Sequence, residues 1–275
     1  MRLKKWYISV LFLAIALNST SKEVDSIRIW HDMYHSTSPR IVAHRGFYNY
    51  PGAAQNSRAS LRNAIRLGVE GSEMDVWLTA DNEIVVNHDA VRDGVTIETS
   101  TLKEVRKLKL GNGERLPLFG EFLRILKTSK KTHLFVEVKK HSTRQRTIEA
   151  GLAAMRAVNA AGLKGMAEYM SFSLPACVAL AKEDPSAKVY YLSGNKSPQE
   201  LHALGISSMN YKAEVYRKHP TWIRDAHSLG MTVTARALNT RNAVREMIEA
   251  GVDNMATDFP VQAMDVRELM TRNKK

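Results

Sequence analysis

The stretch PTWIRDAHSLGMTVTARALNTRNAVREMIEAGVDNMAT, residues 220–257, carries the same pattern twice. Each copy has a segment with helical spacing, 220–229 or 241–250, then a glycine, then an apolar and β-branched run, 231–238 or 252–257. A glycine directly after a helical segment is typical of a helix end. Helices that alternate with strands in this way indicate a parallel sheet whose strands are joined by crossover helices.

The same alternation runs through the chain from residue 39. Eight segments have the short, apolar composition of strands: 41–44, 72–77, 134–139, 167–173, 188–192, 206–211, 231–238 and 252–257. Eight parallel strands close a (β/α)8 barrel, the TIM-barrel architecture. We therefore predict an α/β chain with this barrel, and the competing architecture is a doubly wound open sheet.

The segments between the strands carry helix signals. Helical spacing covers 58–67, 143–161, 220–229, 241–250 and 261–270. Two more helices are predicted to begin at Thr101 and Ser197, because each hydroxyl residue is followed three positions later by Glu. One extra apolar run, 84–87, follows the turn signal Asp81-Asn82, and it predicts a small β-hairpin insertion after strand 2 that carries His88 over the top of the barrel.

Composition is that of an ordinary globular chain, with 275 residues, 44% hydrophobic and 25% charged. The net charge of +12 is spread along the sequence, without the basic clusters of a nucleic-acid module, so we predict no nucleic-acid partner. The single cysteine, Cys177, excludes an intramolecular disulfide and a thiolate zinc cluster, and we interpret it as a core residue. The pattern leaves the oligomeric state open.

The first 21 residues have the layout of a secretory signal peptide. Arg2, Lys4 and Lys5 precede an apolar run over 6–17, which is too short to span a bilayer. We predict cleavage near residue 21, a single barrel domain over 22–275, a periplasmic or secreted location and no stable membrane insertion. The residues before the cut are poor cleavage signals, so an uncleaved anchor is the alternative.

Polar side chains gather at the predicted ends of the first three strands. Active sites of such barrels lie at the carboxyl ends of the strands. Glu73 and Asp75 share one face of the second strand, and Glu137 lies near the end of the third. Three carboxylates in apolar segments are costly to bury without a cation, and oxygen ligands suit Mg²⁺ or Ca²⁺. The sequence therefore predicts a site for one divalent ion.

Four further residues complete the predicted chemistry. Arg45 and Lys139 place fixed positive charge where a phosphate would bind. His44 and His88 would serve as acid and base near neutral pH. Together these residues indicate metal-assisted cleavage of a phosphodiester. Each motif also has a structural alternative: the acids could pair with interior Arg or Lys, and the histidine loops could be ordinary turns.

In combination, these motifs resemble the glycerophosphodiester phosphodiesterase family: His44-Arg45-Gly46, GVEGSEMDV at 68–76, Thr79-Ala80-Asp81, VVNHD at 85–89, Glu137-Val138-Lys139 and GVDNMATDFP at 251–260. The resemblance implies a TIM barrel that hydrolyses glycerophosphodiesters to glycerol 3-phosphate and an alcohol. It also implies roles for the residues already singled out: His44 and His88 as the acid/base pair, Glu73, Asp75 and Glu137 as metal ligands, and Arg45 and Lys139 as phosphate ligands.

Two positions depart from the family pattern. The family usually has Glu-Asn-Thr after the first strand, whereas this chain has Gln55-Asn56-Ser57, so Gln55 is a neutral candidate metal ligand. The seventh strand usually ends in Trp-Thr-Val-Asn, and here Arg236 replaces the tryptophan. Arg236 either points into the mouth, which would favour a more anionic or sugar-like headgroup, or pairs with a loop carboxylate. Phe172 is a candidate for the pocket wall, although core packing explains it equally well.

Two other functions stay open at this point. A cyclising phospholipase would use the same barrel with a substrate hydroxyl as the attacking group. A barrel that binds phosphodiesters or sugars without turnover would account for Gln55 and Arg236, although the presence of both histidines argues against it.

Overall fold

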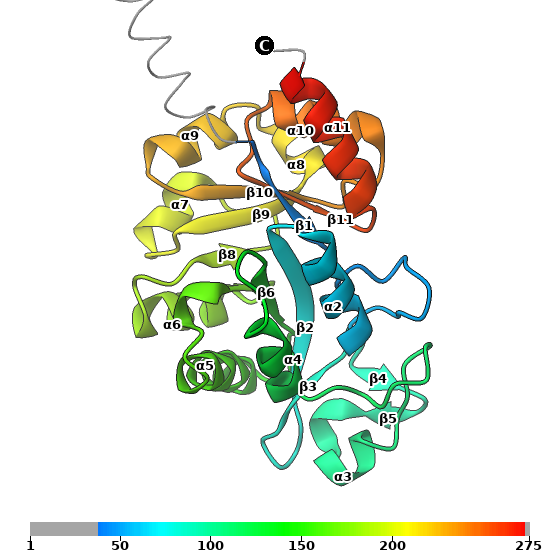
Figure 1. The fold of residues 1–275 in the computed structure, drawn as a ribbon. Helices are drawn as coiled ribbons and strands as arrows, with labels where there is room; N and C mark the ends of the chain where they lie inside the picture. Colours follow the sequence, from blue (N-terminus) through cyan, green and yellow to red (C-terminus); the bar gives the residue numbers. More distant parts are fainter. Residues whose placement is uncertain (1–37, 273–275) are drawn as a thin grey trace, which may run out of the picture. The chain divides into compact units, whose positions relative to one another are not determined.

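Eight parallel strands close into a barrel in the computed structural model, which describes residues 38–272 (Figure 1). Around the barrel they run β1 (Arg40–Ala43), β2 (Gly71–Leu78), β6 (His133–Val138), β7 (Ala167–Ser171), β8 (Val189–Tyr191), β9 (Ser208–Lys212), β10 (Thr232–Arg236) and β11 (Asn254–Thr257). Strand β1 pairs with both β2 and β11, which closes the sheet. The predicted TIM barrel is confirmed, and the open sheet is excluded.

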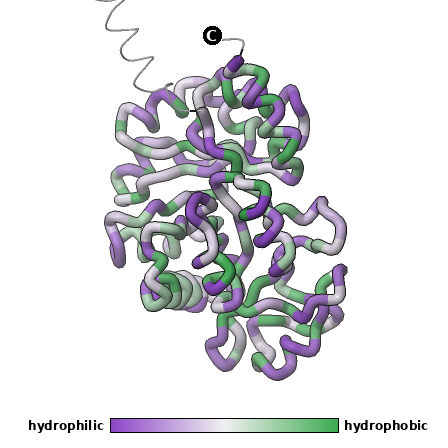
Figure 2. The backbone as a smooth tube through the Cα atoms, viewed as in Figure 1, coloured by the Kyte–Doolittle hydropathy of each residue, from purple (hydrophilic) through white to green (hydrophobic). Residues whose placement is uncertain are grey.

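Helices surround the strands on the outside (Figure 1). They are α2 (Arg58–Leu67), α4 (Phe119–Leu126), α5 (Arg144–Ala160), α6 (Leu174–Glu183), α7 (Pro198–Ala203), α8 (Ala213–Lys218), α9 (Trp222–Ser228), α10 (Arg241–Glu249) and α11 (Pro260–Arg272), with one 3-10 turn, η2 (Lys164–Met166), before β7. Hydrophilic and hydrophobic residues alternate along many of them (Figure 2), as expected for helices with one face on a sheet and one in solvent.

The predicted capping signals are confirmed at two helices. The Ser197 side chain accepts a hydrogen bond from the Glu200 backbone N–H at the start of α7, and Thr101 and Glu104 form the corresponding capping box at α3 (Leu102–Val105). Several strand ends were predicted one or two residues too late. The strand predicted over 167–173, for example, ends at Ser171, and Ser173 caps α6 instead.

The insertion after β2 is larger than a hairpin. Strand β3 (Ile84–Val86) pairs antiparallel with β2 as predicted, and it is followed by β4 (Val91–Arg92), β5 (Val95–Thr96), η1 (Ile97–Thr99) and α3. These elements share a separate hydrophobic cluster that includes Trp77, Val85, Ile97, Val105 and Leu116. The insertion is therefore anchored to β2 by its own small core, which fixes the loop that carries His88.

A charged network fills the amino-terminal end of the barrel, opposite the predicted site. The Arg40 guanidinium donates to both carboxylate oxygens of Glu168 at 2.7 and 3.0 Å, and the Tyr190 hydroxyl donates to Glu168 at 2.6 Å. Burial alone would raise the pKa of Glu168, but the hydrogen bonds from His133 and Arg40 lower it to about 2. This network stabilises the ionised carboxylate inside the sheet.

Cys177 is fully buried in α6, and burial raises the pKa of its thiol to about 12, which supports its prediction as a core residue. No helix within the described residues is long and apolar enough to cross a membrane. The predicted signal peptide over 1–21 lies outside the described residues.

Candidate active site

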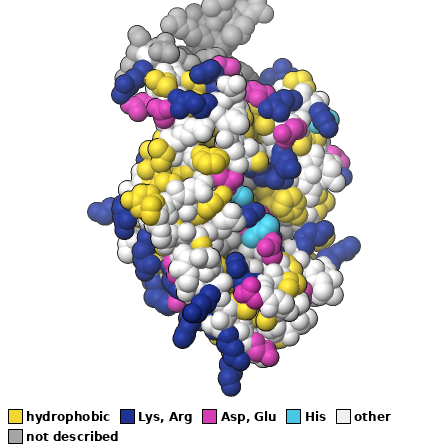
Figure 3. All heavy atoms as spheres, turned by 90° about the vertical axis from the view of Figure 1, so that its right-hand side faces the viewer, with side chains coloured by type: hydrophobic (Ala, Val, Ile, Leu, Met, Phe, Trp, Pro, Cys, Tyr) yellow, Lys and Arg dark blue, Asp and Glu magenta, His cyan; other side chains and the backbone are white. Residues whose placement is uncertain are grey.

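A cavity of about 180 Å³ opens at the carboxyl ends of the barrel strands. Histidine and acidic side chains lie side by side at a hollow on this face of the molecule, with hydrophobic side chains beside them (Figure 3). The cavity is lined by His44, Arg45, Glu73, His88, Glu137, Lys139, Met170, Phe172, Leu192, Asn210, Arg236, Ala237, Ala256 and Asp258. Eight of the ten predicted site residues are in this set, and the other two, Asp75 and Gln55, are described below.

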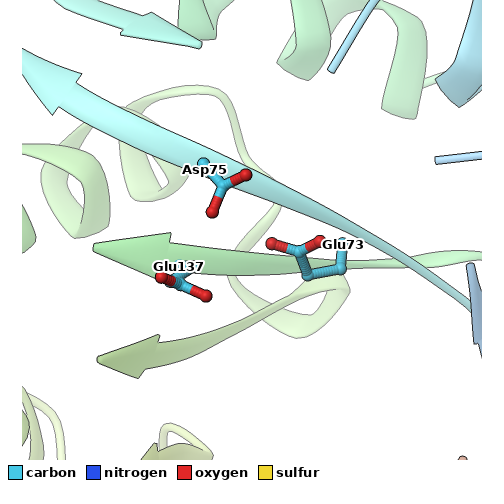
Figure 4. Close-up of side chains that lie close together, drawn as sticks. All are labelled: Glu73, Asp75 and Glu137. Atoms are coloured by element: carbon cyan, nitrogen blue, oxygen red, sulfur yellow. The ribbon is translucent and has the colours of Figure 1, made fainter. Parts of the chain in front are cut away.

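Three carboxylates gather at the floor of the cavity. Glu73 and Asp75 project from β2 and Glu137 from β6, which lies next to it in the sheet (Figure 4). Asp75 is the register partner of Glu137, so the two side chains start from neighbouring backbone positions. One oxygen from each residue lies within 4.8 Å of the others, and all three residues are buried. This geometry brings the predicted acidic ligands together.

The acidic cluster is electrostatically strained. Burial, together with the charge of Asp75, raises the pKa of both Glu73 and Glu137. Lys139 partly compensates, because its Nζ lies 2.8 Å from Glu137 and 3.2 Å from Asp75. The predicted interior ion pair therefore exists, but it lies within the cavity. Glu73 forms no ion pair with Lys139.

The surroundings of Glu73 Oε1 show whether this site suits a metal ion. That oxygen is buried and has no hydrogen-bond partner among the described residues. A buried carboxylate oxygen without a partner is costly, and a hard divalent cation would satisfy it together with the oxygens of Asp75 and Glu137. The residues present therefore fit one divalent ion.

The loop after β1 holds the cluster from one side. Arg45 and Asn56 both have left-handed backbone conformations, with φ of 55° and 59°. The Arg45 backbone N–H donates to Glu73 Oε2 at 2.6 Å. The Asn56 side chain donates to Asp75 Oδ2 at 2.7 Å and accepts from the Asp75 backbone N–H at 3.1 Å. Asn56 was quoted in a motif but given no role, so sequence reasoning missed it.

Gln55 lies outside the acidic cluster. Its side chain is exposed, and its Oε1 accepts a hydrogen bond from Arg45 Nη1 at 2.6 Å. The Arg45 Nε is 3.9 Å from Asp75 Oδ2, so this guanidinium bridges the loop and the cluster. Metal ligation by Gln55 stays a prediction.

Each of the two histidines forms a hydrogen bond to a carboxylate through its Nδ1 atom. His44 Nδ1 lies 2.8 Å from Asp258 Oδ1, and His88 Nδ1 lies 2.7 Å from Asp89 Oδ1. Burial would raise the pKa of Asp258, but the hydrogen bond from His44 lowers it to about 2, and the hydrogen bond from His88 lowers the pKa of Asp89. With these carboxylates ionised, Nδ1 is the protonated nitrogen, and each Nε2 is left for proton exchange.

Asp258 is the second residue that sequence reasoning missed. It follows β11, and the Asn239 side chain donates to its other oxygen at 2.5 Å. The signal was present, because Asp258 lies in the last of the quoted motifs, but its pairing with a residue 214 positions away is visible only in the fold.

Arg236 and Phe172 lie together in the lining of the cavity. Arg236 lines the cavity and has no ion pair among the described residues, so of the two predicted orientations the one toward the mouth is observed. Phe172 is 36% exposed and lines the same cavity, whereas the aromatic residues Trp77 and Tyr211 are buried in the core.

A model of the glycerophosphoryl diester phosphodiesterase family matches residues 44–262. The chain belongs to this family. Membership confirms the resemblance carried by the motifs and makes the chain an enzyme, a phosphoric diester hydrolase. The matched range begins at His44 and includes every predicted site residue.

Related proteins support family membership. A glycerophosphodiester phosphodiesterase of Caldanaerobacter subterraneus is 26% identical over 234 residues, which are 80% of this chain and 94% of that protein. The crystal structure of a glycerophosphodiester phosphodiesterase from Parabacteroides distasonis is 36% identical, with a TM-score of 0.84 over 85% of this chain and 98% of that one. An Oleispira antarctica phosphodiesterase, solved in complex with the product sn-glycerol-3-phosphate, shares the fold at 20% identity, with a TM-score of 0.72 over 86% of this chain and 99% of that one.

Proposed function

We propose that this phosphodiesterase hydrolyses glycerophosphodiesters to glycerol 3-phosphate and an alcohol with the help of one divalent ion. The observation that carries the proposal is the buried cluster of Glu73, Asp75 and Glu137, in one cavity with His44 and His88. The product bound to the Oleispira protein of the same fold supports the choice of substrate.

The acidic cluster would hold the ion, Mg²⁺ or Ca²⁺. Glu73, Asp75 and Glu137 offer oxygen ligands only, which suits either hard cation. When bound, the ion would supply positive charge beside the phosphate oxygens. Gln55 is a predicted further ligand.

Fixed positive charge on the protein would bind and orient the phosphate. The Lys139 ammonium lies in the cavity wall with 14% of its side chain exposed, and Arg45 lies at the neighbouring strand end with 19% exposed. Cations held in place by carboxylates need little reorganisation when charge develops on the phosphate oxygens. These two residues therefore position phosphorus next to the acidic cluster.

The two histidines would move the protons. One imidazole Nε2 accepts a proton from the attacking oxygen, and the other donates a proton to the leaving alcohol oxygen. Asp258 and Asp89 fix the ring orientations through Nδ1. Because Asp258 is itself held by Asn239, His44 is the more rigidly oriented of the pair.

Hydrolysis of glycerophosphoethanolamine tests the proposal. We expect turnover that is lost after complete metal removal, returns with Mg²⁺ or Ca²⁺, and falls strongly in His44→Ala. The matched control is His202→Ala, since His202 is an exposed histidine of α7 outside the cavity. Activity that survives both metal removal and His44→Ala would refute the proposal. Tight binding with no product would identify a barrel without turnover, and a transient cyclic phosphate in phosphorus NMR would identify a cyclising enzyme.

We also propose that the chain is exported. The proposal is supported by the basic start and short apolar run within residues 1–21. Cell fractionation with amino-terminal sequencing of the recovered protein tests it. A chain that keeps Met1 and stays in the cytoplasm would contradict it.

A further inference from the structure

Arg236 is the one basic side chain of the cavity lining without an ion pair in the part of the chain that the structure describes. The other basic side chains of the lining each form an ion pair with a carboxylate: His44, Arg45, His88 and Lys139. Arg236 is the last residue of β10, at the carboxyl end of the barrel. The cavity therefore carries one positive charge that no carboxylate of the described residues pairs with.

Neutral groups hold the Arg236 guanidinium in place. Its Nη2 donates to the Leu192 carbonyl at 3.0 Å, its Nε donates to the Asn210 carbonyl at 3.4 Å, and its Cζ lies 5.1 Å from the centre of the Phe172 ring. Burial lowers the pKa of Arg236, and the charge of Glu137 offsets this effect only in part. Carbonyl oxygens and an aromatic face balance a buried charge incompletely, so an anion at this place would be stabilising.

The order of strands fixes where this charge lies relative to phosphorus. In a closed ring of eight strands, β10 is four strands from β6, so the Arg236 end of the cavity faces the end that carries Glu137 and Lys139. A phosphate held by Lys139 would then have one of its two substituents on the Arg236 side of the cavity. Asn210 lines the same wall, and its buried Oδ1 has no hydrogen-bond partner among the described residues, so this wall also offers an acceptor.

We propose that Arg236 makes the enzyme select glycerophosphodiesters whose alcohol part carries an anionic group, a carboxylate or a phosphate. The proposal rests on the proposed function, since it assigns the substrate class of the same cavity. The guanidinium would donate to the anion of the headgroup, and Asn210 would accept from a neighbouring hydroxyl or ammonium group.

Two matched substrate pairs test this selectivity and separate the two anions. Glycerophosphoserine differs from glycerophosphoethanolamine by one carboxylate, and glycerophosphoinositol 4-phosphate differs from glycerophosphoinositol by one phosphate. We expect kcat/KM to favour the anionic member of at least one pair. In Arg236→Gln the ratio of kcat/KM for the anionic member to kcat/KM for the neutral member of that pair should fall by roughly 10- to 100-fold. This is the range expected when a hydrogen bond to a charged group is lost. Arg236→Lys, which keeps the charge, should retain part of the preference.

Lys212→Gln is the matched control, because Lys212 is an exposed cation at the end of the neighbouring strand β9 and does not line the cavity. In Lys212→Gln, the ratio of kcat/KM for the anionic to the neutral member of each pair should equal that of the wild type. The wild-type enzyme alone gives a second test that does not depend on the folding of a variant: glycerophosphoserine should be a better substrate than its carboxyl methyl ester.

Equal kcat/KM within both pairs, or ratios that stay unchanged in a folded Arg236→Gln, would overturn the inference. An equal loss on all four substrates would also overturn it, because Arg236 would then contact a part that all of them share. In each of these cases the enzyme still hydrolyses glycerophosphodiesters, so the proposed function stands. Absence of hydrolysis of every substrate would instead contradict the proposed function.

Discussion

Glu73→Gln should make the ion-free protein more stable and remove its response to divalent ions. In the wild type, Glu73 Oε1 is buried without a hydrogen-bond partner and lies near two other carboxylates. A neutral amide of similar shape relieves the repulsion and can donate to Asp75 or Glu137. We expect a gain in the free energy of unfolding of about 1–3 kcal/mol in EDTA, the usual cost of a buried unpartnered acceptor. For a domain of this size, that gain corresponds to a rise in Tm of roughly 2–10 °C.

The rise in Tm on addition of divalent ions should be smaller in Glu73→Gln than in the wild type. An ion that binds only the folded protein adds about 2.7 kcal/mol at 100 times its Kd, so the wild-type Tm should rise by roughly 5–10 °C with Mg²⁺ or Ca²⁺. Glu73→Gln should lose most of this rise, whereas Glu83→Gln, the same change at an exposed residue of the β2–β3 turn, should keep it. Calorimetric melting with and without EDTA measures both effects. A Glu73→Gln variant that melts below the wild type in EDTA, or one that keeps the full rise with divalent ions, would contradict a metal-binding role for Glu73.

Three further predictions follow from other contacts. Asp258→Asn removes the charge-assisted hydrogen bond to His44 and should lower kcat by roughly 10- to 100-fold with little change in KM, measured by steady-state hydrolysis. Asn56→Gly keeps the left-handed backbone accessible but removes both hydrogen bonds to Asp75, and should weaken divalent-ion affinity by roughly 10- to 100-fold in titration calorimetry. The pKa of Glu168 is about 2 in the folded protein and 4.5 ordinarily, so its stabilising contribution of about 3 kcal/mol is complete above pH 4.5 and is lost as the pH falls toward 2. Denaturant unfolding across this range should show the loss in the wild type, and Glu168→Gln should lack that component.

Most of the barrel could be predicted because its strands and many of its helices carry local signals. The β-branched runs and the capping residue Ser197 gave element type and approximate position. Helix α4 escaped prediction because Leu118, which has no hydroxyl, stands at its cap, and α6 escaped because its cap, Ser173, was read as the end of a strand. Local patterns are ambiguous wherever the capping side chain is absent or belongs equally well to a neighbouring element.

The sequence predicts which residues make up the site better than it predicts the hydrogen bonds between them. The period of two placed Glu73 and Asp75 on one face, and strand order brought Glu137 beside them. The hydrogen bond from Asn56 to Asp75 and the pair formed by His44 with Asp258 depend on how loops fold over the barrel mouth. The orientation of Arg236 toward the cavity likewise depends on which carboxylates the finished fold leaves within its reach.

Diffraction from crystals soaked in Mn²⁺, recorded at the manganese absorption edge, shows whether Glu73, Asp75 and Glu137 bind a divalent ion together. We expect one anomalous peak at the carboxyl end of the barrel, within coordination distance of oxygens from Glu73, Asp75 and Glu137. Crystals of active protein with no peak among these carboxylates, and with the acids paired only to Lys139 and Arg45, would contradict this expectation.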